Sequence, residues 1–270
     1  MADQVHDTRP VIRIFVSHML PVVSISVVVH GQGDLVARAL ADLADFADAI
    51  RFEVVLTKNI PEQLPFSAAH FPYPLKVLEN AAPRGFGANH NAAFRLARGE
   101  RFCVMNPDIR MPVDPFPVLL EEMERREATV IAPAVLSPAG QIEDSVRKFP
   151  TPTSLVLKML GKKNGRYPFK LGDDTFAADW VGGMFMLFRT EDYRRIGGFD
   201  EDFFLYYEDV DICARLWKAG HEVLACPKAQ VIHEARRASR HNLQYTRWHI
   251  ASMVRYLGKH WLGLPNSAGH

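Results

Sequence analysis

The sequence predicts an α/β fold, a doubly wound and mainly parallel central sheet with helices on both faces. Short apolar or β-branched segments alternate with helical patterns over the first 110 residues, which is typical of such sheets. Segment 22–29 is short and rich in valine, as expected of a strand buried on both faces. Ligands of this fold class bind at the carboxyl ends of the strands. The polar residues at these ends are His30, Thr57, Asn80 and Asp108.

The first half of the chain supplies the parallel strands. We expect strands over 22–29, 52–57, 75–78 and 101–105. Apolar residues at helical spacing predict a helix over 35–46, capped by Asp34. The same spacing predicts a second helix over 89–98, which Gly99 ends.

The second half is less regular. We expect strands over 130–135, 181–188, 223–226 and 230–233, and helices over 116–126 and 209–219. A stretch rich in Pro, Lys and Gly over 145–176 predicts a loop with one short helix. A basic amphipathic helix follows over 242–262. We therefore expect one α/β domain over 1–241, with a C-terminal helix and tail over 242–270 packed on it.

Composition excludes several classes of function. The chain has 270 residues and a formal net charge of +1, so it lacks the basic surface of a nucleic-acid-binding protein. Its first ten residues lack the apolar core of a signal peptide, and no run is long enough to span a membrane. Cys103, Cys213 and Cys226 have no metal-binding spacing, which indicates reduced core thiols. We expect a cytoplasmic protein, at most peripheral to the inner face of the membrane.

The segment 197–211 has the most distinctive composition. Six acidic residues fall within twelve positions, interleaved with aromatic residues, and a helical pattern follows directly. Acidic residues at a helix start stabilise the helix dipole, but three of them exceed what capping needs. The pattern favours a pocket that binds a polyol and removes a proton from it. Asp209 is the candidate general base.

Asn106-Pro107-Asp108 follows an expected buried strand, so the Asp108 carboxylate is expected to lie in the ligand crevice. It is a candidate ligand for Mg²⁺ or Mn²⁺, although the same three residues also form turns. The imidazole of His233 could complete such a site; the alternative is a polar strand end. Three arginines after it could pair with phosphate oxygens or form a solvated basic face. They are Arg236, Arg237 and Arg240.

The glycine-containing stretch 84–91 leaves two alternatives open. It follows an expected strand, opens a helix and precedes Asp108 by about twenty residues, as in a dinucleotide-binding fingerprint. However, His90 occupies the third small position. In a nucleotide-sugar site, Arg84 and Asn91 would instead supply polar contacts.

The order and spacing of these motifs resemble the inverting glycosyltransferases of family 2, which have the GT-A fold. The matching stretches are 24–31, 85–91, 106–108, 180–189, 197–220 and 231–233. Asn-Pro-Asp together with Arg-Lys-Phe-Pro at 147–150 is similar to the rhamnosyltransferase-like branch. Two positions depart from the family pattern: Asn106 replaces an acidic residue, and the second strand does not end in aspartate.

The resemblance implies a role for each site residue. Asp108 and His233 would bind the metal ion, and Asp209 would be the base. The donor-binding residues would be His30, Arg84, Gly85, Asn91, Asn106 and Asp108. The acceptor-binding residues would be Trp180, Gly182, Gly183, Tyr207 and Glu208, with the rings of 203–207 shaping the subsite.

The expected function is metal-dependent transfer, with inversion, of a sugar from a nucleotide-diphosphate sugar. Rhamnose is one candidate sugar, and the acceptor would be a saccharide or lipid-linked saccharide in cell-surface polysaccharide synthesis. Two alternatives are a nucleotide-dependent oxidoreductase with a Rossmann-type site at 75–108 and a non-catalytic sugar-binding relative. The C-terminal helix carries an apolar stripe that could face its own domain, a second subunit or an anionic membrane. That stripe is Ile250, Val254, Leu257 and Trp261.

Overall fold

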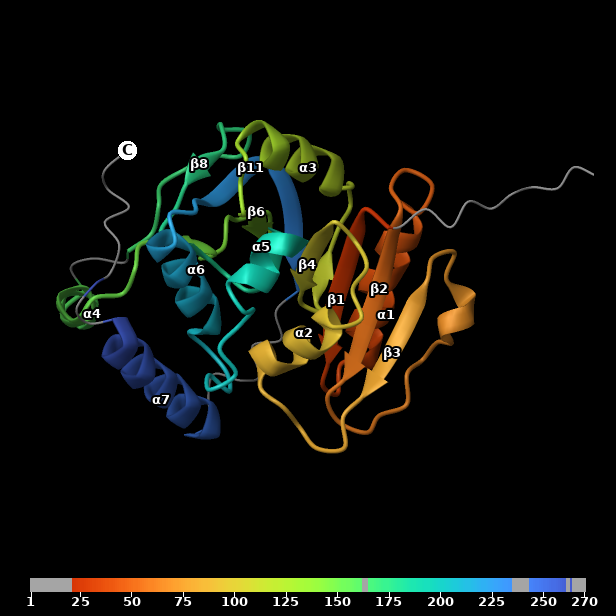
Figure 1. Ribbon diagram of the computed structural model, residues 1–270, viewed down its shortest axis with the longest axis horizontal. Coiled ribbons are helices and arrows are strands. Elements are labelled where there is room, and N and C mark those ends of the chain that lie inside the picture. Colours follow the sequence, from red (N-terminus) through yellow and green to blue (C-terminus); the bar gives the residue numbers. More distant parts are fainter. Residues whose placement is uncertain (1–20, 162–164, 235–242, 261–262, 264–270) are drawn as a thin grey trace, which may run out of the picture.

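The computed structural model describes residues 21–161, 165–234, 243–260 and 263. One large sheet runs through the molecule. Its edge strand β3 lies on the right of Figure 1, and α7 lies at the lower left. The strand order along the sheet is β3-β2-β1-β4-β10-β6-β11-β5. The strands are β1 (Val23–Val29), β2 (Phe52–Lys58), β3 (Leu75–Glu79), β4 (Arg101–Met105), β5 (Ile109–Arg110), β6 (Val130–Leu136), β10 (Phe185–Arg189) and β11 (Val223–His233).

The direction of the strands confirms the predicted fold class. The first four strands along the sheet, from β3 to β4, are parallel to one another. β10 runs antiparallel to both β4 and β6, whereas β6 and β11 are parallel. The short β8 (Phe176–Ala177) pairs with β11, and a separate ribbon joins β7 (Val146–Arg147) to β9 (Trp180–Val181). The sheet is therefore mixed and mainly parallel.

Helices cover both faces of the sheet. The alternate residues Val23, Ile25, Val27 and Val29 of β1 pack in one core with α1 (Gly33–Ala44) and α3 (Phe116–Arg125). The second core, on the other face, includes residues of α5 (Thr190–Arg195), α6 (Glu208–Lys218) and α7 (Leu243–His260). α2 (Phe86–Phe94) lies on this second face against β1, while α4 (Pro152–Met159) and the 3₁₀ turn η1 (Ala68–His70) lie in connections. The three cysteines are buried free thiols, as predicted.

Ser24 of β1 and Glu53 of β2 form a buried polar pair on the second face. Ser24 donates to the Glu53 carboxylate at 2.8 Å, and the backbone N–H of Arg98 donates to the same oxygen at 2.8 Å. Lys76 and the Arg98 guanidinium complete the set around Glu53. A buried carboxylate is tolerated only when it is paired in this way, so Glu53 ties β1, β2 and the end of the α2 region together.

Several element boundaries differ from the prediction. α1 begins at Gly33, so Asp34 lies in its first turn and does not cap it; Gln32 is the N-cap. α2 begins three residues earlier than expected, because Gly85 supplies an extended N-cap, and it ends at Phe94, four residues before the expected end. The two pieces expected at 223–233 form one strand, β11, with an irregularity between Cys226 and Gln230.

Only part of the apolar stripe predicted for the C-terminal helix faces the core, where Leu257 is partly buried and packs against the second core. Ile250 and Val254 are 50% and 61% exposed, whereas Ser252, Tyr256 and His260 are buried. These three residues recur every four positions, so α7 packs through a polar and aromatic stripe beside α6 (Figure 1). Trp261 lies outside the described residues, as do residues 1–20 and Arg236, Arg237 and Arg240. Within the described part of the chain, no helix is both long and apolar enough to cross a membrane.

Candidate active site

A sharp turn between β9 and β10 joins two of the predicted motifs. The strand expected over 181–188 is interrupted at Gly182–Met184. At this turn the backbone N–H of Gly183 donates to Oδ2 of Asp209 at 3.0 Å. The carbonyl of the next residue, Met184, accepts a hydrogen bond from the N–H of Asn106 at 2.9 Å. The turn thus links the start of α6 to the end of β4, where Asn106-Pro107-Asp108 lies.

The three acids at the start of α6 have different surroundings. Asp209 is only partly buried, and its carboxylate accepts from the N–H groups of Gly183 and Val210. Burial raises the pKa of Asp209, and the hydrogen bonds from Gly183 and Val210 oppose that rise. Burial, together with the charge of Asp209, raises the pKa of Glu208 well above its ordinary value. Oε2 of Glu208 is buried and has no hydrogen-bond partner among the described residues.

The third acid, Asp211, is fully buried and belongs to an ion-pair network. Burial acts to raise its pKa, but His260, Arg215 and Lys259 lower the pKa to about 2. Asp211 is therefore held as a structural carboxylate. Of the three acids, Asp209 alone combines partial exposure with a polar carboxylate environment, which suits a proton acceptor.

The chain reaches α6 through an unusual backbone corner. Tyr206 and Tyr207 have φ values of 70° and 67°, in the left-handed region that residues with side chains seldom adopt. Tyr207 is the N-cap of α6, so the corner sets the direction in which Glu208 and Asp209 leave the chain. Strain at such a corner is typical of functional sites.

The second predicted cluster lies where β11 meets β5. His233 pairs with Ile109 across these strands, and the N–H of Glu234 donates to the carbonyl of Asp108 at 2.8 Å. This register brings Nε2 of His233 to 3.4 Å from Oδ2 of Asp108. The structure therefore places the two predicted metal ligands side by side.

Sequence reasoning missed the third member of this cluster, Glu143. Its Oε2 lies 2.8 Å from Nδ1 of His233, and its backbone N–H donates to Val135 of β6. Burial acts to lower the pKa of His233, but the carboxylates of Asp108 and Glu143 raise it to about 9. The turn-forming residues 137–140 before Glu143 were the sequence signal that could have identified it. A turn there brings the chain back beside the end of β6, where Ile142 bridges to Leu136.

The cluster has the chemistry of a divalent-cation site with an incomplete set of protein ligands. Oδ1 of Asp108 is buried and has no hydrogen-bond partner among the described residues. A carboxylate oxygen and an imidazole suit Mg²⁺ or Mn²⁺. However, the described residues contain no group of three or more His, Cys, Asp or Glu side chains that could hold a metal by themselves. Asp108 and His233 could therefore supply only part of the ligand set of such an ion.

Of the predicted donor-binding residues, His30 lies beside two asparagines that were not predicted to bind the donor. Nδ2 of Asn59 lies 3.2 Å from Nδ1 of His30, and Asn80 donates to Asn59 at 2.9 Å, all at the carboxyl ends of strands. Asn59, which the sequence pattern did not single out, also holds Arg84 through both of that residue's backbone groups. A cavity of about 400 Å³ opens beside them at the ends of β2 and β3. Its lining residues are Lys58, Ile60, Pro61, Glu62, Gln63, Glu79 and Asn80.

Arg84 and Asn91 turn toward the segment 199–201. Arg84 pairs with Glu201 at 3.2 Å. The Asn91 amide bonds to both backbone groups of Phe199 and also to Tyr193 and Glu201. The hydrogen-bonding groups of Asn91 are thus used within the protein, and the structure does not support the donor contact predicted for this residue.

The glycines of 84–91 serve close packing. A Cβ on Gly85 would lie 2.7 Å from the carbonyl oxygen of Phe204, and one on Gly87 would lie 2.6 Å from Phe199. The N–H of Phe86, at the start of α2, already donates to Phe204. The segment 199–204 therefore covers the backbone that a dinucleotide would have to approach, which argues against the Rossmann-type alternative.

The predicted acceptor-binding residues line the β7–β9 ribbon and the corner before α6. The Trp180 indole donates to Lys148, and the N–H of Gly182 donates to Ser145 at 2.8 Å. Among the rings of 203–207, Phe203 is fully buried in the second core. That ring cannot shape an acceptor subsite, contrary to the expectation, because it has no exposed surface.

Comparisons with known proteins agree with this architecture. The family described as glycosyl transferase family 2 matches residues 24–178, and the one described as the N-terminal domain of galactosyltransferase matches residues 170–242. The rhamnosyltransferase WbbL of Escherichia coli (strain K12) is 31% identical over 248 residues, covering 88% of this chain and 93% of that protein. An N-acetylglucosaminyl-diphospho-decaprenol L-rhamnosyltransferase of Mycobacterium tuberculosis is 29% identical, covering 80% of this chain and 76% of that protein.

Solved structures share the fold at low sequence identity. The structure of GalNAc-T7 with UDP, GalNAc and Mn²⁺ matches with a TM-score of 0.65 at 15% identity over 92% of this chain. The chain spans about half (49%) of the length of that structure. The mannosyltransferase PcManGT of Pyrobaculum calidifontis, in complex with GDP-Man and Mn²⁺, matches with a TM-score of 0.58 at 18% identity, covering 88% of this chain and 65% of that one. The chain belongs to glycosyl transferase family 2 and is a GT-A glycosyltransferase similar to rhamnosyltransferases.

Proposed function

We propose that the protein transfers a sugar, with inversion, from a nucleotide-diphosphate sugar to a hydroxyl of a saccharide or lipid-linked saccharide. Rhamnose is the leading candidate sugar, because two relatives are named as rhamnosyltransferases. A lipid-linked saccharide acceptor is supported by the name of the mycobacterial relative, an N-acetylglucosaminyl-diphospho-decaprenol L-rhamnosyltransferase. A role in cell-surface polysaccharide synthesis stays a prediction. The observation that carries the proposal is the hydrogen bond from Gly183 to Asp209, beside the strand end that bears Asp108.

In the proposed reaction, Asp209 accepts the proton of the acceptor hydroxyl. The oxygen forms a bond to the anomeric carbon while the bond from that carbon to the diphosphate oxygen breaks. The electron pair of the broken bond leaves with the nucleoside diphosphate. A single displacement inverts the anomeric configuration, and one base is sufficient for it. The N–H of Gly183 holds the carboxylate in place, and Glu208 beside it stays protonated more readily because it is buried.

Asp108 and His233 would hold a divalent cation, Mg²⁺ or Mn²⁺, together with oxygens of the donor diphosphate. When bound, such an ion neutralises the negative charge that develops on the leaving diphosphate. The structures of GalNAc-T7 and PcManGT, which contain Mn²⁺, support the choice of ion class. Glu143 orients the His233 ring from its other nitrogen.

The remaining predicted residues complete the proposed site. His30, Arg84 and Asn106 would lie along the donor, whereas Gly85 is covered by Phe204. Trp180, Gly182, Tyr207 and Glu208 would lie along the acceptor. We also propose that the protein acts in the cytoplasm, because its three thiols are free, at the membrane face where a lipid-linked acceptor would lie. A division of the chain at residue 241 and a homodimer stay predictions.

A donor screen tests the proposed function. Purified protein is incubated with a panel of nucleotide sugars and a saccharide-diphospho-lipid acceptor, and released nucleoside diphosphate is measured with Mg²⁺, Mn²⁺ or EDTA. We expect metal-dependent release with one donor class, and a glycosylated acceptor by mass spectrometry. A protein that binds nucleotide sugars but transfers none would support the non-catalytic alternative. Thermal stabilisation by NAD, and by no nucleotide sugar, would support the oxidoreductase.

A further inference from the structure

We propose that the C-terminal helix α7 positions the base: it clamps the left-handed corner at Tyr206–Tyr207 and the first turn of α6, on both sides of Asp209. This inference rests on the proposed function for the role of Asp209. The helix contributes no group to the reaction itself. Its residues are positioning residues that act through the segment 200–211.

The first set of contacts lies before Asp209, at the corner. Ser252 donates to the carbonyl of Leu205 at 2.9 Å, one residue before the left-handed pair. The centroid of the His249 ring lies 5.3 Å from that of the Tyr206 ring and 5.4 Å from that of the Tyr207 ring. Tyr256, which is fully buried, packs on Tyr207 at 5.5 Å. Because the left-handed conformation is unfavourable for tyrosine, the corner needs such contacts to persist.

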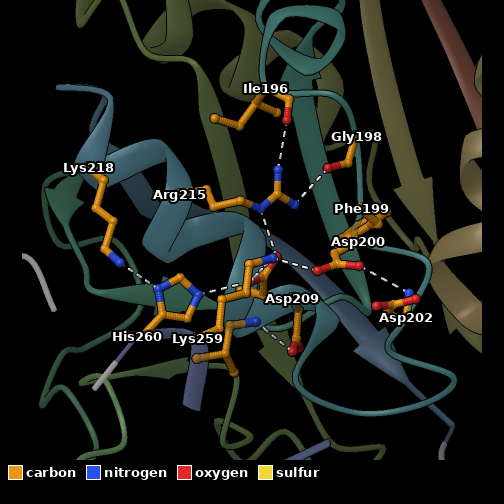
Figure 2. A network of polar contacts seen from close by, with 12 residues as sticks. Ile196, Gly198, Phe199, Asp200, Asp202, Asp209, Arg215, Lys218, Lys259 and His260 are labelled. Carbon is orange, nitrogen blue, oxygen red and sulfur yellow. Dashed lines mark hydrogen bonds and ion pairs between the residues drawn. The ribbon is translucent and has the colours of Figure 1, made fainter. Parts of the chain in front are cut away.

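The second set of contacts lies after Asp209, at Asp211. His260 Nε2 and Lys259 Nζ each lie 2.8 Å from Oδ1 of Asp211, while Arg215 pairs with the other oxygen at 2.7 Å. Figure 2 shows His260, Lys259 and Arg215 gathered in this network beside Asp209. All three partners of Asp211 are cations or donors, so the buried carboxylate is compensated. Two of the three come from α7.

His260 is oriented by a second contact. Lys218 of α6 lies 2.8 Å from its Nδ1. An ammonium group can only donate, so Nδ1 accepts and the Nε2–H is left to donate to Asp211. The imidazole therefore bridges two residues of α6, and it needs one donor and one acceptor to do so.

Further ion pairs attach the loop before the corner to the same helix. Lys259 pairs with Asp200 at 2.5 Å (Figure 2), and Arg255 pairs with Asp202 at 2.7 Å. The segment from Asp200 to Asp211 is thus bound to α7 at both of its ends. Asp209 lies between these attachments, and its hydrogen bond with Gly183 depends on the position of that segment.

The test compares variants of His260 in the full chain. His260→Leu removes both hydrogen bonds, whereas His260→Gln keeps one donor and one acceptor. We expect His260→Leu to lower kcat at least about tenfold, with the KM for the donor unchanged, because misplacing a base slows only the chemical step. His260→Gln should restore most of kcat. Val254→Ala, on the exposed face of α7, is the matched control and should keep wild-type kcat.

A second readout does not require turnover. Amide hydrogen exchange at Gly183 and Val210 reports on the acceptor carboxylate of Asp209, because both N–H groups donate to it. In His260→Leu these amides should exchange about tenfold faster, while those of β1 and β4 keep their protection. Ser252→Ala should shift the same amides if His260→Leu fails to fold.

Wild-type amide exchange at Gly183 and Val210 in both His260→Leu and Ser252→Ala would overturn the inference. Equal losses of kcat in His260→Leu and His260→Gln would also overturn it. Failure of the proposed function is a separate outcome, because it is seen as absence of transfer by the wild-type protein with every donor. In that case a shift in exchange would still support the clamp.

Discussion

Oδ2 of Asp209 accepts a hydrogen bond from the backbone N–H of Gly183 at 3.0 Å. These residues are 26 positions apart, at the start of α6 and in the turn between β9 and β10. A backbone donor has a fixed direction, so it orients the carboxylate without neutralising it. The turn that supplies this donor also bonds to Asn106, which links the proposed base to the strand end that bears Asp108.

Replacement of Asp209 by asparagine should abolish most of the turnover. The amide oxygen can still accept from Gly183, so the local geometry is kept, but an amide cannot take the acceptor's proton. We expect kcat to fall by about 10²- to 10⁴-fold, the range typical of a lost general base. The dissociation constant of the donor, measured by calorimetry with Mn²⁺, should stay at the wild-type value. Turnover near that of the wild type would show that another group removes the proton.

Replacement of Gly183 by alanine should disturb the same contact. The added Cβ would lie 3.2 Å from the Phe86 ring and 3.6 Å from Cβ of Asp209. The Phe86 ring cannot easily move aside, because its centroid lies 4.4 Å from that of the His90 ring and 5.8 Å from that of the Phe199 ring. We expect kcat to fall about tenfold or more, since small displacements of a catalytic group are costly.

The matched control for Gly183→Ala is Gly182→Ala. Its Cβ would meet the terminal methyl group of Met184 at 3.0 Å, and that flexible side chain can move aside. The loss of kcat should therefore be smaller than for Gly183→Ala. Equal losses in the two variants would contradict the argument that Phe86 and Asp209 make position 183 special.

The raised pKa of Glu208 predicts that the stability of the protein depends on pH. The pKa of Glu208 in the folded protein is raised well above the ordinary value of 4.5 by burial and by the charge of Asp209. A raised pKa means that this group's contribution to stability is fully present below about pH 4.5 and is lost as the pH rises through the folded pKa. Glutamine resembles the protonated acid at every pH. Glu208→Gln should therefore match the wild type near pH 4.5 and become the more stable of the two as the pH rises.

Urea unfolding at about pH 5 and pH 8 measures this difference. When the pKa of a group differs by one between the folded and the unfolded protein, the free energy of unfolding changes by about 1.4 kcal/mol. Asp211→Asn should behave in the opposite way, because the pKa of Asp211 is lowered to about 2 and its ion pairs stabilise the protein at neutral pH. Parallel pH profiles for wild type and Glu208→Gln would show that Glu208 ionises freely in the folded protein.

The parts of the fold that the sequence predicted are those set by local patterns. The limits of β4 agree because an apolar run ends at Asn106-Pro107, where the backbone must turn. Asp108 and His233 lie close together because Asp108 follows β4 and His233 ends β11, at the same end of the sheet, where β5 pairs with β11. The roles of the two residues stay proposals.

What the sequence did not predict depends on contacts between distant residues. The apolar residues of α7 indicated one stripe, but of that stripe Ile250 and Val254 are exposed and Leu257 is partly buried. The most buried residues of α7 are instead Ser252, Tyr256 and His260. The partners of Ser252 and His260, Leu205 and Asp211, lie about 50 residues away, so helical periodicity gave no sign of them. Glu143 was missed for the same reason, since it lies 90 residues from His233 in the sequence.

Glu143 should strengthen metal binding although it is not a proposed ligand. Its carboxylate lies 2.8 Å from Nδ1 of His233, and the opposite ring nitrogen faces Asp108. A carboxylate at Nδ1 fixes the ring and keeps the proton on that nitrogen, which leaves Nε2 free to bind an ion. Loss of such a partner typically weakens metal affinity by about 10- to 100-fold. We expect Glu143→Gln to weaken Mn²⁺ affinity by about 10-fold, because the amide oxygen can still accept from Nδ1–H of His233. Glu143→Ala should weaken it by about 100-fold.

Electron paramagnetic resonance of free Mn²⁺, titrated with protein and a nucleoside diphosphate, measures the affinity without turnover. Asp144→Asn is the matched control, because it removes a neighbouring negative charge whose partners are Arg147 and Arg166 at 2.9 and 3.0 Å. Its Mn²⁺ affinity should equal that of the wild type. If Glu143→Ala also binds Mn²⁺ like the wild type, Glu143 does not orient His233 toward the ion. If Asp144→Asn weakens binding as much as Glu143→Ala does, the effect comes from total charge rather than from the contact with His233.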